Sequence, residues 1–191
     1  MSGEIILDIE TQNTFQEIGK HDHTQLKVSL LVIYDTSSGE FSTYLESELG
    51  KLWPVLERAD RLIGYNLKGF DIPVLNNYYP GDLRRIQTLD IMEEIEKKVG
   101  FRVKLDDVAQ TTLGVGKSGT GLMAIEYWRK GEIEKLKAYC EQDVRVTRDL
   151  YNYGLEKKEV AFVDRLGRKI SVPVDFGQFQ VKQALNYTMP F

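Results

Sequence analysis

The chain has 191 residues, which is the size of one ordinary domain and enough to bury a substantial core. A hydrophobic share of 42% and a charged share of 28% are typical of a globular protein. The net charge of −4 and the pI near 5.4 exclude binding of a polyanion by bulk attraction, so any contact with nucleic acid must be local or bridged by cations.

The sequence also bounds the location and the cysteine chemistry of the protein. The N-terminus, MSGEIIL, has no basic start followed by a long apolar run, and no segment has the apolar length that a bilayer span needs. We therefore expect a cytoplasmic protein without a membrane partner. Cys140 is the only cysteine, which excludes a disulfide framework and a zinc site built from thiolates.

The first half of the chain predicts five strands, because β-branched and aromatic residues cluster between turn signals. The predicted strands span residues 4–10, 26–34, 40–46, 61–66 and 85–90. The first three are expected to form an antiparallel meander. Two helices are predicted, one at 47–59, where Pro54 is a candidate for the true start, and one at 72–79.

The second half is predicted to be mostly helical up to about residue 158. Its apolar residues form one broad helical stripe over 132–153, and Gly154 is expected to end that helix. Residues 160–174 predict a hairpin that turns at RLGR, and residues 178–187 predict a short terminal helix.

These elements predict an α/β fold, a mixed five-stranded sheet flanked by helices. We expect one domain over residues 1–158. Residues 159–191 are expected to form a small C-terminal extension, a hairpin and a helix, packed on the same domain.

Two carboxylates share one face of the first predicted strand, which reads EIILDIET from residue 4 to residue 11. Side chains alternate between the faces of a strand, so Asp8 and Glu10 point the same way, although like charges repel and acids are depleted in strands. The pair lies at the carboxyl end of the strand, where a layered sheet of this kind usually binds its ligand. A D-x-E pattern alone is weak evidence, because about one match is expected by chance.

Two further stretches carry acids, and each has an ordinary explanation when it stands alone. In GYNLKGFDIPVL, residues 64–75, Asp71 follows a strand and precedes a helical turn, so a helix N-cap explains it equally well. In AYCEQDVRV, residues 138–146, Tyr139 and Asp143 stack on one helical face because they are four residues apart. An isolated pair of this kind is usually a partly buried tyrosine beside an exposed aspartate.

Taken in order, the three stretches resemble the motifs of the DEDD superfamily of 3′–5′ exonucleases, which have the ribonuclease H-like fold. The motifs are D-x-E-T at 8–11, N-x-x-x-F-D at 66–71 and Y-x-x-x-D at 139–143. With Tyr139 in its third motif, the chain resembles the branch of this superfamily that has Tyr rather than His at that position. Within that branch the chain resembles family B polymerase proofreading domains and stand-alone bacterial ribonuclease H-like exonucleases. Residues 105–119, LDDVAQTTLGVGKSG, also resemble the stretch that those proteins carry between the second and third motifs. The resemblance covers residues 4 to about 153.

This resemblance implies a metal-dependent enzyme that removes nucleoside 5′-monophosphates from a 3′ end. Hydrolysis would use two divalent ions, Mg²⁺ or Mn²⁺, held by hard oxygen ligands. By resemblance, Asp8 bridges the two ions and Asp71 supports the second through direct or water-mediated contact. Glu10 and Asp143 complete the ion that activates water. Tyr139 completes the catalytic set, and we expect it to orient the attacking water, because a phenol with a pKa near 10 is a poor base at neutral pH.

Four residues are candidates for substrate contacts, and each has a structural alternative. Phe70 would stack on the terminal base, unless it belongs to the core. Asn66 would bond the substrate or fix its own loop, and Thr11 would do the same at the terminal sugar. Lys117 would meet a phosphate, although a solvated lysine is the more common case. The expected partner is nucleic acid with a free 3′ end, single-stranded, and DNA in preference to RNA. The expected role is in DNA repair, and a helicase or polymerase is a possible protein partner.

Two other functions stay open from the sequence. An endonuclease on the same fold usually offers a different fourth acid and no Tyr-to-Asp pair, and a non-catalytic nucleic-acid-binding module has no need of paired acids. GKS at 116–118 lacks the earlier glycine and the strand of a phosphate-binding loop, which makes an NTPase site a poor explanation. HDH at 21–23 is expected to be a solvated loop rather than a metal site. Cys140 is expected in the core, and a run of basic residues is expected on the surface: Arg84, Arg85, Lys97, Lys98, Arg102 and Lys104.

Overall fold

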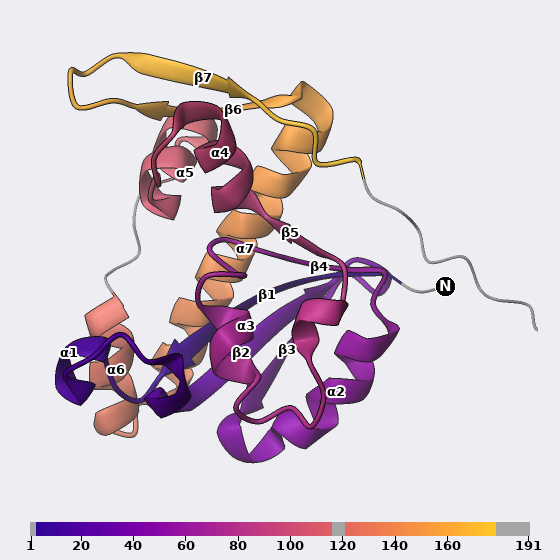
Figure 1. The fold of residues 1–191 in the computed structure, drawn as a ribbon, viewed down its shortest axis with the longest axis vertical. Helices are drawn as coiled ribbons and strands as arrows, with labels where there is room; N and C mark the ends of the chain where they lie inside the picture. Colours follow the sequence, from indigo (N-terminus) through magenta and orange to yellow (C-terminus); the bar gives the residue numbers. More distant parts are fainter. Residues whose placement is uncertain (1–2, 116–120, 179–191) are drawn as a thin grey trace, which may run out of the picture.

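The computed structural model describes residues 3–115 and 121–178, and its centre is a mixed five-stranded sheet (Figure 1). The strands lie in the order β3-β2-β1-β4-β5. Their bounds are β1 (Glu4–Thr11), β2 (Val28–Asp35), β3 (Glu40–Leu45), β4 (Arg61–Gly64) and β5 (Thr88–Asp90). Strand β2 is antiparallel to β1 and to β3, whereas β4 is parallel to β1 and to β5. The predicted α/β sheet and its antiparallel opening are confirmed.

Both faces of the central strands are buried, which explains their near-continuous apolar sequences. On one face, Ile6 of β1 packs in the same core as Leu30 and Val32 of β2. On the other face, Ile5 and Leu7 belong to a second core. The alternation of side chains along a strand therefore divides the apolar residues of the sheet between two layers.

Helices cover the two faces of the sheet unequally (Figure 1). The core on the Ile6 face is completed by α4 (Ile91–Val99), α5 (Leu105–Leu113), α6 (Gly121–Arg129) and α7 (Ile133–Lys157). The core on the other face is completed by α2 (Leu49–Arg58) and α3 (Asp71–Leu75). Connections contain α1 (Phe15–Ile18) and the 3-10 turns η1 (His23–Gln25), η2 (Glu46–Glu48) and η3 (Leu83–Arg85). Within the described ranges, no helix combines the length and the apolar composition that crossing a bilayer requires.

Helix α2 begins at Leu49 and contains Pro54, so the prediction of a start at the proline is wrong. A proline inside a helix costs about 3 kcal/mol or more, because it lacks an N–H and crowds the preceding turn. Leu52 and Leu56 are fully buried against the sheet, and such burial contributes about 1.5–3 kcal/mol for each leucine. Packing therefore outweighs the local preference of the proline.

Two other predicted boundaries also differ. Strand β5 begins at Thr88 rather than at residue 85, because the 3-10 turn η3 takes up the preceding residues. The side chain of Asp82 caps that turn by accepting the Arg84 N–H at 3.0 Å. Helix α3 ends at Leu75 rather than at residue 79.

The C-terminal part begins with a helix that is longer than predicted. Helix α7 continues through Gly154 to Lys157, so the prediction that this glycine ends the helix is wrong. The glycine instead leaves room for Phe176, whose Cε2 would lie 2.2 Å from a Cβ added there. The predicted hairpin is present as β6 (Glu159–Val163) and β7 (Lys169–Pro173). The predicted terminal helix lies outside the described residues, apart from Gln178.

A buried arginine joins several segments at the end of the sheet where β1 and β4 begin. Arg61 is 1% exposed, and its Nε and Nη2 bind Oε1 of Glu4 at 2.9 and 2.5 Å. Its Nη2 also donates to the Tyr151 hydroxyl at 2.9 Å, and its Nη1 donates to the Phe176 carbonyl at 2.9 Å. This one side chain thus connects β1, β4, α7 and the segment after β7.

Candidate active site

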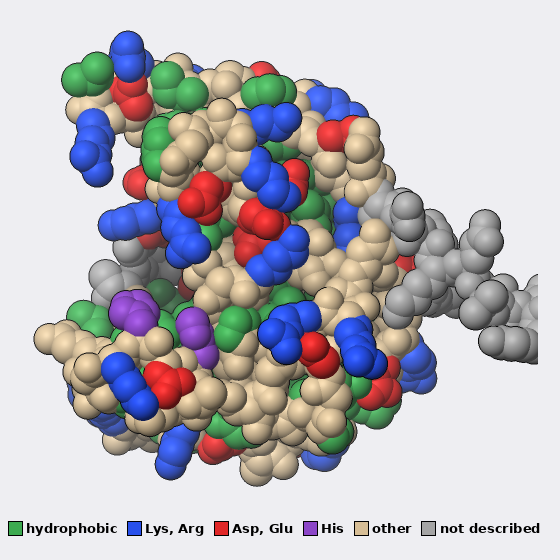
Figure 2. Space-filling view, in the orientation of Figure 1, with side chains coloured by type: hydrophobic (Ala, Val, Ile, Leu, Met, Phe, Trp, Pro, Cys, Tyr) green, Lys and Arg blue, Asp and Glu red, His purple; other side chains and the backbone are tan. Residues whose placement is uncertain are grey.

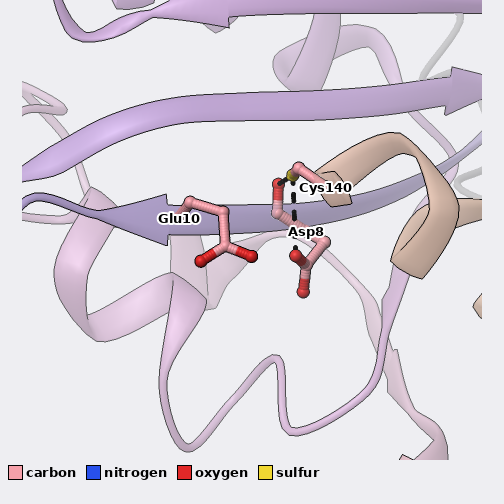
Figure 3. A group of neighbouring side chains, drawn as sticks. All are labelled: Asp8, Glu10 and Cys140. Carbon is pink, nitrogen blue, oxygen red and sulfur yellow. Dashed lines mark hydrogen bonds between the residues drawn. The ribbon is translucent and has the colours of Figure 1, made fainter. Parts of the chain in front are cut away.

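Asp8 and Glu10 project from the same side of β1, and Cys140 of α7 lies against them (Figure 3). One ligand atom from each of these three residues lies within 4.8 Å of the others. The Cys140 thiol donates to the main-chain oxygen of Asp8 at 3.4 Å and to its Oδ2 at 3.6 Å. Cys140 is fully buried in the core, as predicted, and it also fixes how closely α7 approaches the carboxylates.

Asp71 reaches the same place from the start of α3. Strand β4 pairs with β1 only as far as Ile6, which leaves room beside the later residues of β1. Oδ1 of Asp71 fills part of that room by accepting the backbone N–H of Ile9 at 3.1 Å. Asp71 is 3% exposed and is the first residue of α3, whose N-cap is Phe70, so the assignment of Asp71 as the N-cap is wrong.

Helix α7 brings Tyr139 and Asp143 to this group, one helical turn apart. The charge of Asp143 acts on Asp8, on Glu10 and on the Tyr139 phenol, which places it among them. The structure therefore collects the predicted residues from β1, α3 and α7 at the carboxyl end of β1.

Burial and mutual repulsion shift the acids of this site in one direction. Burial raises the pKa of Asp8 well above its usual range, and the charge of Asp143 adds to that rise. Burial likewise raises the pKa of Glu10, which is 9% exposed, with further increases from Asp8, Asp143 and Asp71. The pKa of Asp71 rises for the same two reasons, burial first and then the charge of Asp8. A nearby cation would favour the ionised forms of all these groups.

The Tyr139 phenol is held in its protonated form. Burial raises its pKa, and the neighbouring carboxylates of Asp143, Glu10 and Asp8 raise it further. The phenol is therefore a hydrogen-bonding group at neutral pH and a poor proton acceptor.

A cavity of about 410 Å³ lies beside the carboxylates. It is lined by residues that include Glu10, Thr11, Phe15, Leu26, Phe70 and Leu122. The rings of Phe15 and Phe70 meet edge to face with centroids 6.0 Å apart. Phe70 is thus both a partly buried member of the core edge and a wall of the cavity. Thr11 also lines the cavity, while its hydroxyl donates to the Asn13 carbonyl at 2.9 Å.

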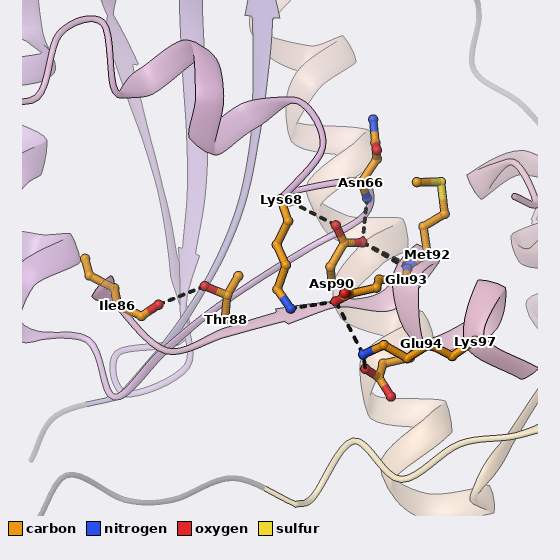
Figure 4. A network of polar contacts seen from close by, with 9 residues as sticks. All are labelled: Asn66, Lys68, Ile86, Thr88, Asp90, Met92, Glu93, Glu94 and Lys97. Carbon is orange, nitrogen blue, oxygen red and sulfur yellow. Dashed lines mark hydrogen bonds and ion pairs between the residues drawn. The ribbon is translucent and has the colours of Figure 1, made fainter. Parts of the chain in front are cut away.

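Asp90 holds the loop that leads to Phe70 and Asp71 (Figure 4). Its carboxylate accepts the backbone N–H groups of Asn66 and Lys68, both at 2.9 Å, on one side. On the other side it accepts two N–H groups of the first turn of α4, at 3.1 and 3.3 Å. Asp90 is 2% exposed, so these bonds are shielded from water. Sequence reasoning missed this residue, and its only signal is an aspartate between a predicted strand and a helix.

The predicted substrate residues are placed differently from one another. Asn66 adopts a left-handed φ of 64°, and its Oδ1 lies only 2.4 Å from where a Cβ on Gly69 would be. That Oδ1 is buried and has no hydrogen-bond partner among the described residues. Lys117 lies outside the described residues. Sequence reasoning also missed Phe15 and Leu122, which carry no motif signal.

Two other sequence features are explained by packing and ion pairs. The rings of His21 and His23 pack against Phe15 at centroid distances of 4.2 and 5.0 Å, which places the HDH segment at the edge of the cavity. Three of the six residues of the predicted basic run pair with acids, among them Arg84 with Asp82 at 2.8 Å. Lys97 pairs with Glu94 at 2.7 Å, and Arg102 pairs with Glu96 at 3.4 Å.

Comparisons with known proteins agree with this architecture. A family model described as RNase_H superfamily matches residues 5–154. A family B DNA polymerase from the hyperthermophilic archaeon Pyrobaculum calidifontis has a similar structure, with a TM-score of 0.62 and 23% identity over 81% of this chain and 25% of the polymerase chain. RNase D from Trypanosoma brucei is also similar, with a TM-score of 0.55 and 15% identity over 80% of this chain and 57% of that chain. No curated protein sequence matches the chain.

The chain thus spans about a quarter of the polymerase and just over half of RNase D. At these identities the two likenesses concern the fold. The family match is broader evidence, because it runs from β1 to α7 and contains all three motifs. The chain therefore belongs to the RNase_H superfamily.

Proposed function

We propose that this protein is a metal-dependent 3′–5′ exonuclease that hydrolyses phosphodiester bonds in nucleic acid and releases nucleoside 5′-monophosphates. The observation that carries the proposal is the gathering of Asp8, Glu10, Asp71 and Asp143 from three elements at one end of β1. Folding has to bring these like charges together against repulsion and desolvation. A bound cation would offset both costs, because an opposite charge favours the ionised forms of the carboxylates.

The donor set fits divalent magnesium or manganese, which prefer carboxylate oxygens. We propose that the four carboxylates would hold two such ions. When bound, the ions neutralise charge on the scissile phosphate, provide a hydroxide nucleophile at neutral pH and stabilise the leaving oxygen.

Other residues of the chain position the reactants. Tyr139 stays protonated at neutral pH, so its Oη can hydrogen-bond to the attacking water and orient it. Asp71 has a structural role besides metal binding, because its Oδ1 accepts the Ile9 N–H and so connects α3 to β1. The thiol of Cys140 restrains the carboxylate of Asp8 through its 3.6 Å contact.

The apolar cavity beside Glu10 is suited to the terminal base of the substrate. Phe70 and Phe15 offer aromatic surfaces, and stacking on such surfaces is worth roughly 1 to 3 kcal/mol for each base. We propose that Thr11 contacts the terminal sugar, that Asn66 bonds the substrate or fixes its own loop, and that Lys117 meets a phosphate. A base inserted in this cavity cannot remain paired, which favours a single-stranded 3′ end. The direction of cleavage rests on the likeness of the three motifs to the DEDD exonucleases.

The wider setting is part of the same proposal. DNA is the favoured substrate and RNA the alternative, since the choice depends on how the sugar site treats a 2′-hydroxyl. A place in DNA repair beside a helicase or polymerase, and a division into a domain at 1–158 and an extension at 159–191, remain predictions from the sequence.

The function is tested with matched 5′-labelled DNA and RNA, single- and double-stranded, in the presence of Mg²⁺ or Mn²⁺. We expect stepwise shortening from the 3′ end, nucleoside 5′-monophosphates as the released product, and no activity after metal removal. Asp8→Ala and Asp143→Ala serve as inactive controls. Internal cuts would support an endonuclease instead, and binding without shortening across metals and pH values would support a non-catalytic binding module.

A further inference from the structure

The turn between β6 and β7 projects beyond α5 at one corner of the molecule (Figure 1). We call residues 163–169 the hairpin tip. Leu166 is 75% exposed and Val163 is 49% exposed, which makes them two of the most exposed large apolar side chains in the described ranges. Basic residues surround them, because Arg165, Arg168 and Lys169 are all exposed. Figure 2 shows this corner as a mixture of apolar and basic side chains.

The charge of the hairpin tip is only partly compensated. Asp164 is its one acid, and it is used internally, since it pairs with Arg168 at 2.7 Å and accepts the Leu166 N–H at 2.8 Å. Arg165 and Lys169 form no ion pair with any described residue. Two cations that no described acid pairs with therefore lie near an exposed leucine, in a chain whose net charge is −4.

The base of the hairpin is held firmly. The Thr112 hydroxyl of α5 donates to the Ala161 carbonyl and accepts the Ala161 N–H, both at 2.9 Å. Phe162 is 3% exposed and meets Phe101 edge to face at 5.8 Å between centroids. Packing thus secures the strands, but nothing in the described part of the fold uses the apolar side chain at the turn.

The hairpin tip and the segment that carries both histidines lie toward the same side of the molecule in Figures 1 and 2. Figure 2 shows a hollow between the part built by α4, α5 and the hairpin and the part that carries both histidines. His21 and His23 pack on Phe15, which lines the cavity beside Glu10, so this edge of the hollow marks the cavity. The hollow is the path that we assign to a strand whose 3′-terminal nucleotide occupies the cavity.

We infer that the hairpin tip binds the nucleic-acid strand upstream of the nucleotide being removed. Arg165 and Lys169 meet backbone phosphates, and Leu166 packs against bases. The polarity of the strand in this assignment rests on the proposed exonuclease function. The argument for nucleic acid as the occupant is charge complementarity, because a negatively charged protein needs local cations to hold a polyanion.

The test measures binding rather than hydrolysis. A 5′-fluorescein single strand of about 20 nucleotides, long enough to cross more than one contact, is titrated by anisotropy without added Mg²⁺ or Mn²⁺ at several salt concentrations. Arg165→Glu with Lys169→Glu should weaken binding about tenfold and lower the slope of log K against log salt by about 1.4, which is 0.7 for each lost phosphate contact. Leu166→Ser should weaken binding without changing that slope. Lys51→Glu with Arg58→Glu, an equal charge change on exposed residues of α2, is the matched control and should leave both quantities unchanged.

Hydrolysis of a dinucleotide, which is too short to reach the hairpin tip, is measured in parallel and should keep its rate in all these variants. Binding by the hairpin-tip variants equal to that of the wild type would overturn the inference and point to a protein as the occupant, while dinucleotide cleavage by the wild type would still support the proposed function. An equal loss in the α2 control would also overturn the inference. If the hairpin-tip variants bind more weakly and the wild type cleaves neither substrate, the result would support the proposed contact and contradict the proposed exonuclease function.

Discussion

Oδ1 of Asp71 accepts the backbone N–H of Ile9 at 3.1 Å, between the two acids of β1. The carboxylate has two oxygens, so one can serve the fold while the other serves a ligand. An asparagine keeps the accepting oxygen and loses the charge, whereas an alanine loses both. Substitutions at this position therefore separate structure from chemistry.

Asp71→Asn should fold normally and lose activity by about 100-fold or more, because it removes a charge that would hold metal directly or through water, and even outer partners of a metal contribute 10- to 100-fold. Asp71→Ala should lose activity equally and also be destabilised by about 1–3 kcal/mol, because the buried Ile9 N–H is left unpaired. Urea unfolding and single-strand hydrolysis measure the two effects. Equal stability of both variants would show that the Ile9 bond contributes nothing.

The metal-free protein should become less stable as pH rises above the ordinary range of carboxyl groups. Asp8, Glu10 and Asp71 have raised pKa values in the folded state, so there they hold protons that the unfolded chain has already released. Stability falls with pH wherever the folded state binds more protons, so this contribution is complete below the unfolded pKa, near 4, and is lost as pH rises through the folded pKa.

The measurement is urea unfolding in a chelator between about pH 5 and 8, compared with Asp8→Asn, which removes one of the repelling charges. The stability difference in favour of the variant should grow with pH. Added Mg²⁺ or Mn²⁺ should reverse the order by stabilising the wild type, by about 2.7 kcal/mol at a hundred times the dissociation constant. A difference that does not depend on pH would contradict the proposed repulsion.

Tyr139→Phe should reduce the rate by about 100-fold, a typical contribution from a group that positions or transfers a proton. The ring remains to fill its place on α7, so stability and metal affinity should be nearly unchanged. Calorimetric titration with Mn²⁺ checks this, with Asp8→Ala as the variant that should lose metal binding. Comparable losses of metal affinity in both would contradict the role given to the tyrosine.

Asp90→Asn should loosen the loop that ends at Phe70 and Asp71. The amide nitrogen of asparagine cannot accept the Lys68 N–H that Oδ2 now takes, even if its oxygen keeps the three bonds of Oδ1, so we expect a destabilisation of about 2 kcal/mol. The Michaelis constant for single strands should rise more than kcat falls, since the cavity wall moves while the acids of β1 stay. Asp82→Asn, at the cap of an exposed 3-10 turn, is the control and should change neither constant.

Much of the fold follows from local patterns in the sequence. The alternating and continuous apolar runs predict the strands, because a sheet that is buried on both faces requires apolar residues along its central strands. The motif residues lie at strand ends and on one face of α7. The errors arose where distant packing decided the outcome. Burial of Leu52 and Leu56 keeps Pro54 inside α2, and Phe176 is the reason that Gly154 lies within α7.

The site shows the same division. Asp8, Glu10 and Tyr139 belong to short motifs with fixed spacing, whereas Phe15 faces the cavity only because α1 folds back beside α3. Asp90 is one acid among many in the sequence, and its four backbone bonds appear only when the β4 loop and the start of α4 are placed together.

The buried guanidinium of Arg61 makes the last described segment inseparable from the sheet. Cutting the chain after Lys158 would take away the Phe176 carbonyl that holds Nη1, and would leave an empty slot beside Gly154. Truncated proteins that end at the long helix should therefore aggregate or unfold, even though every motif lies before the cut.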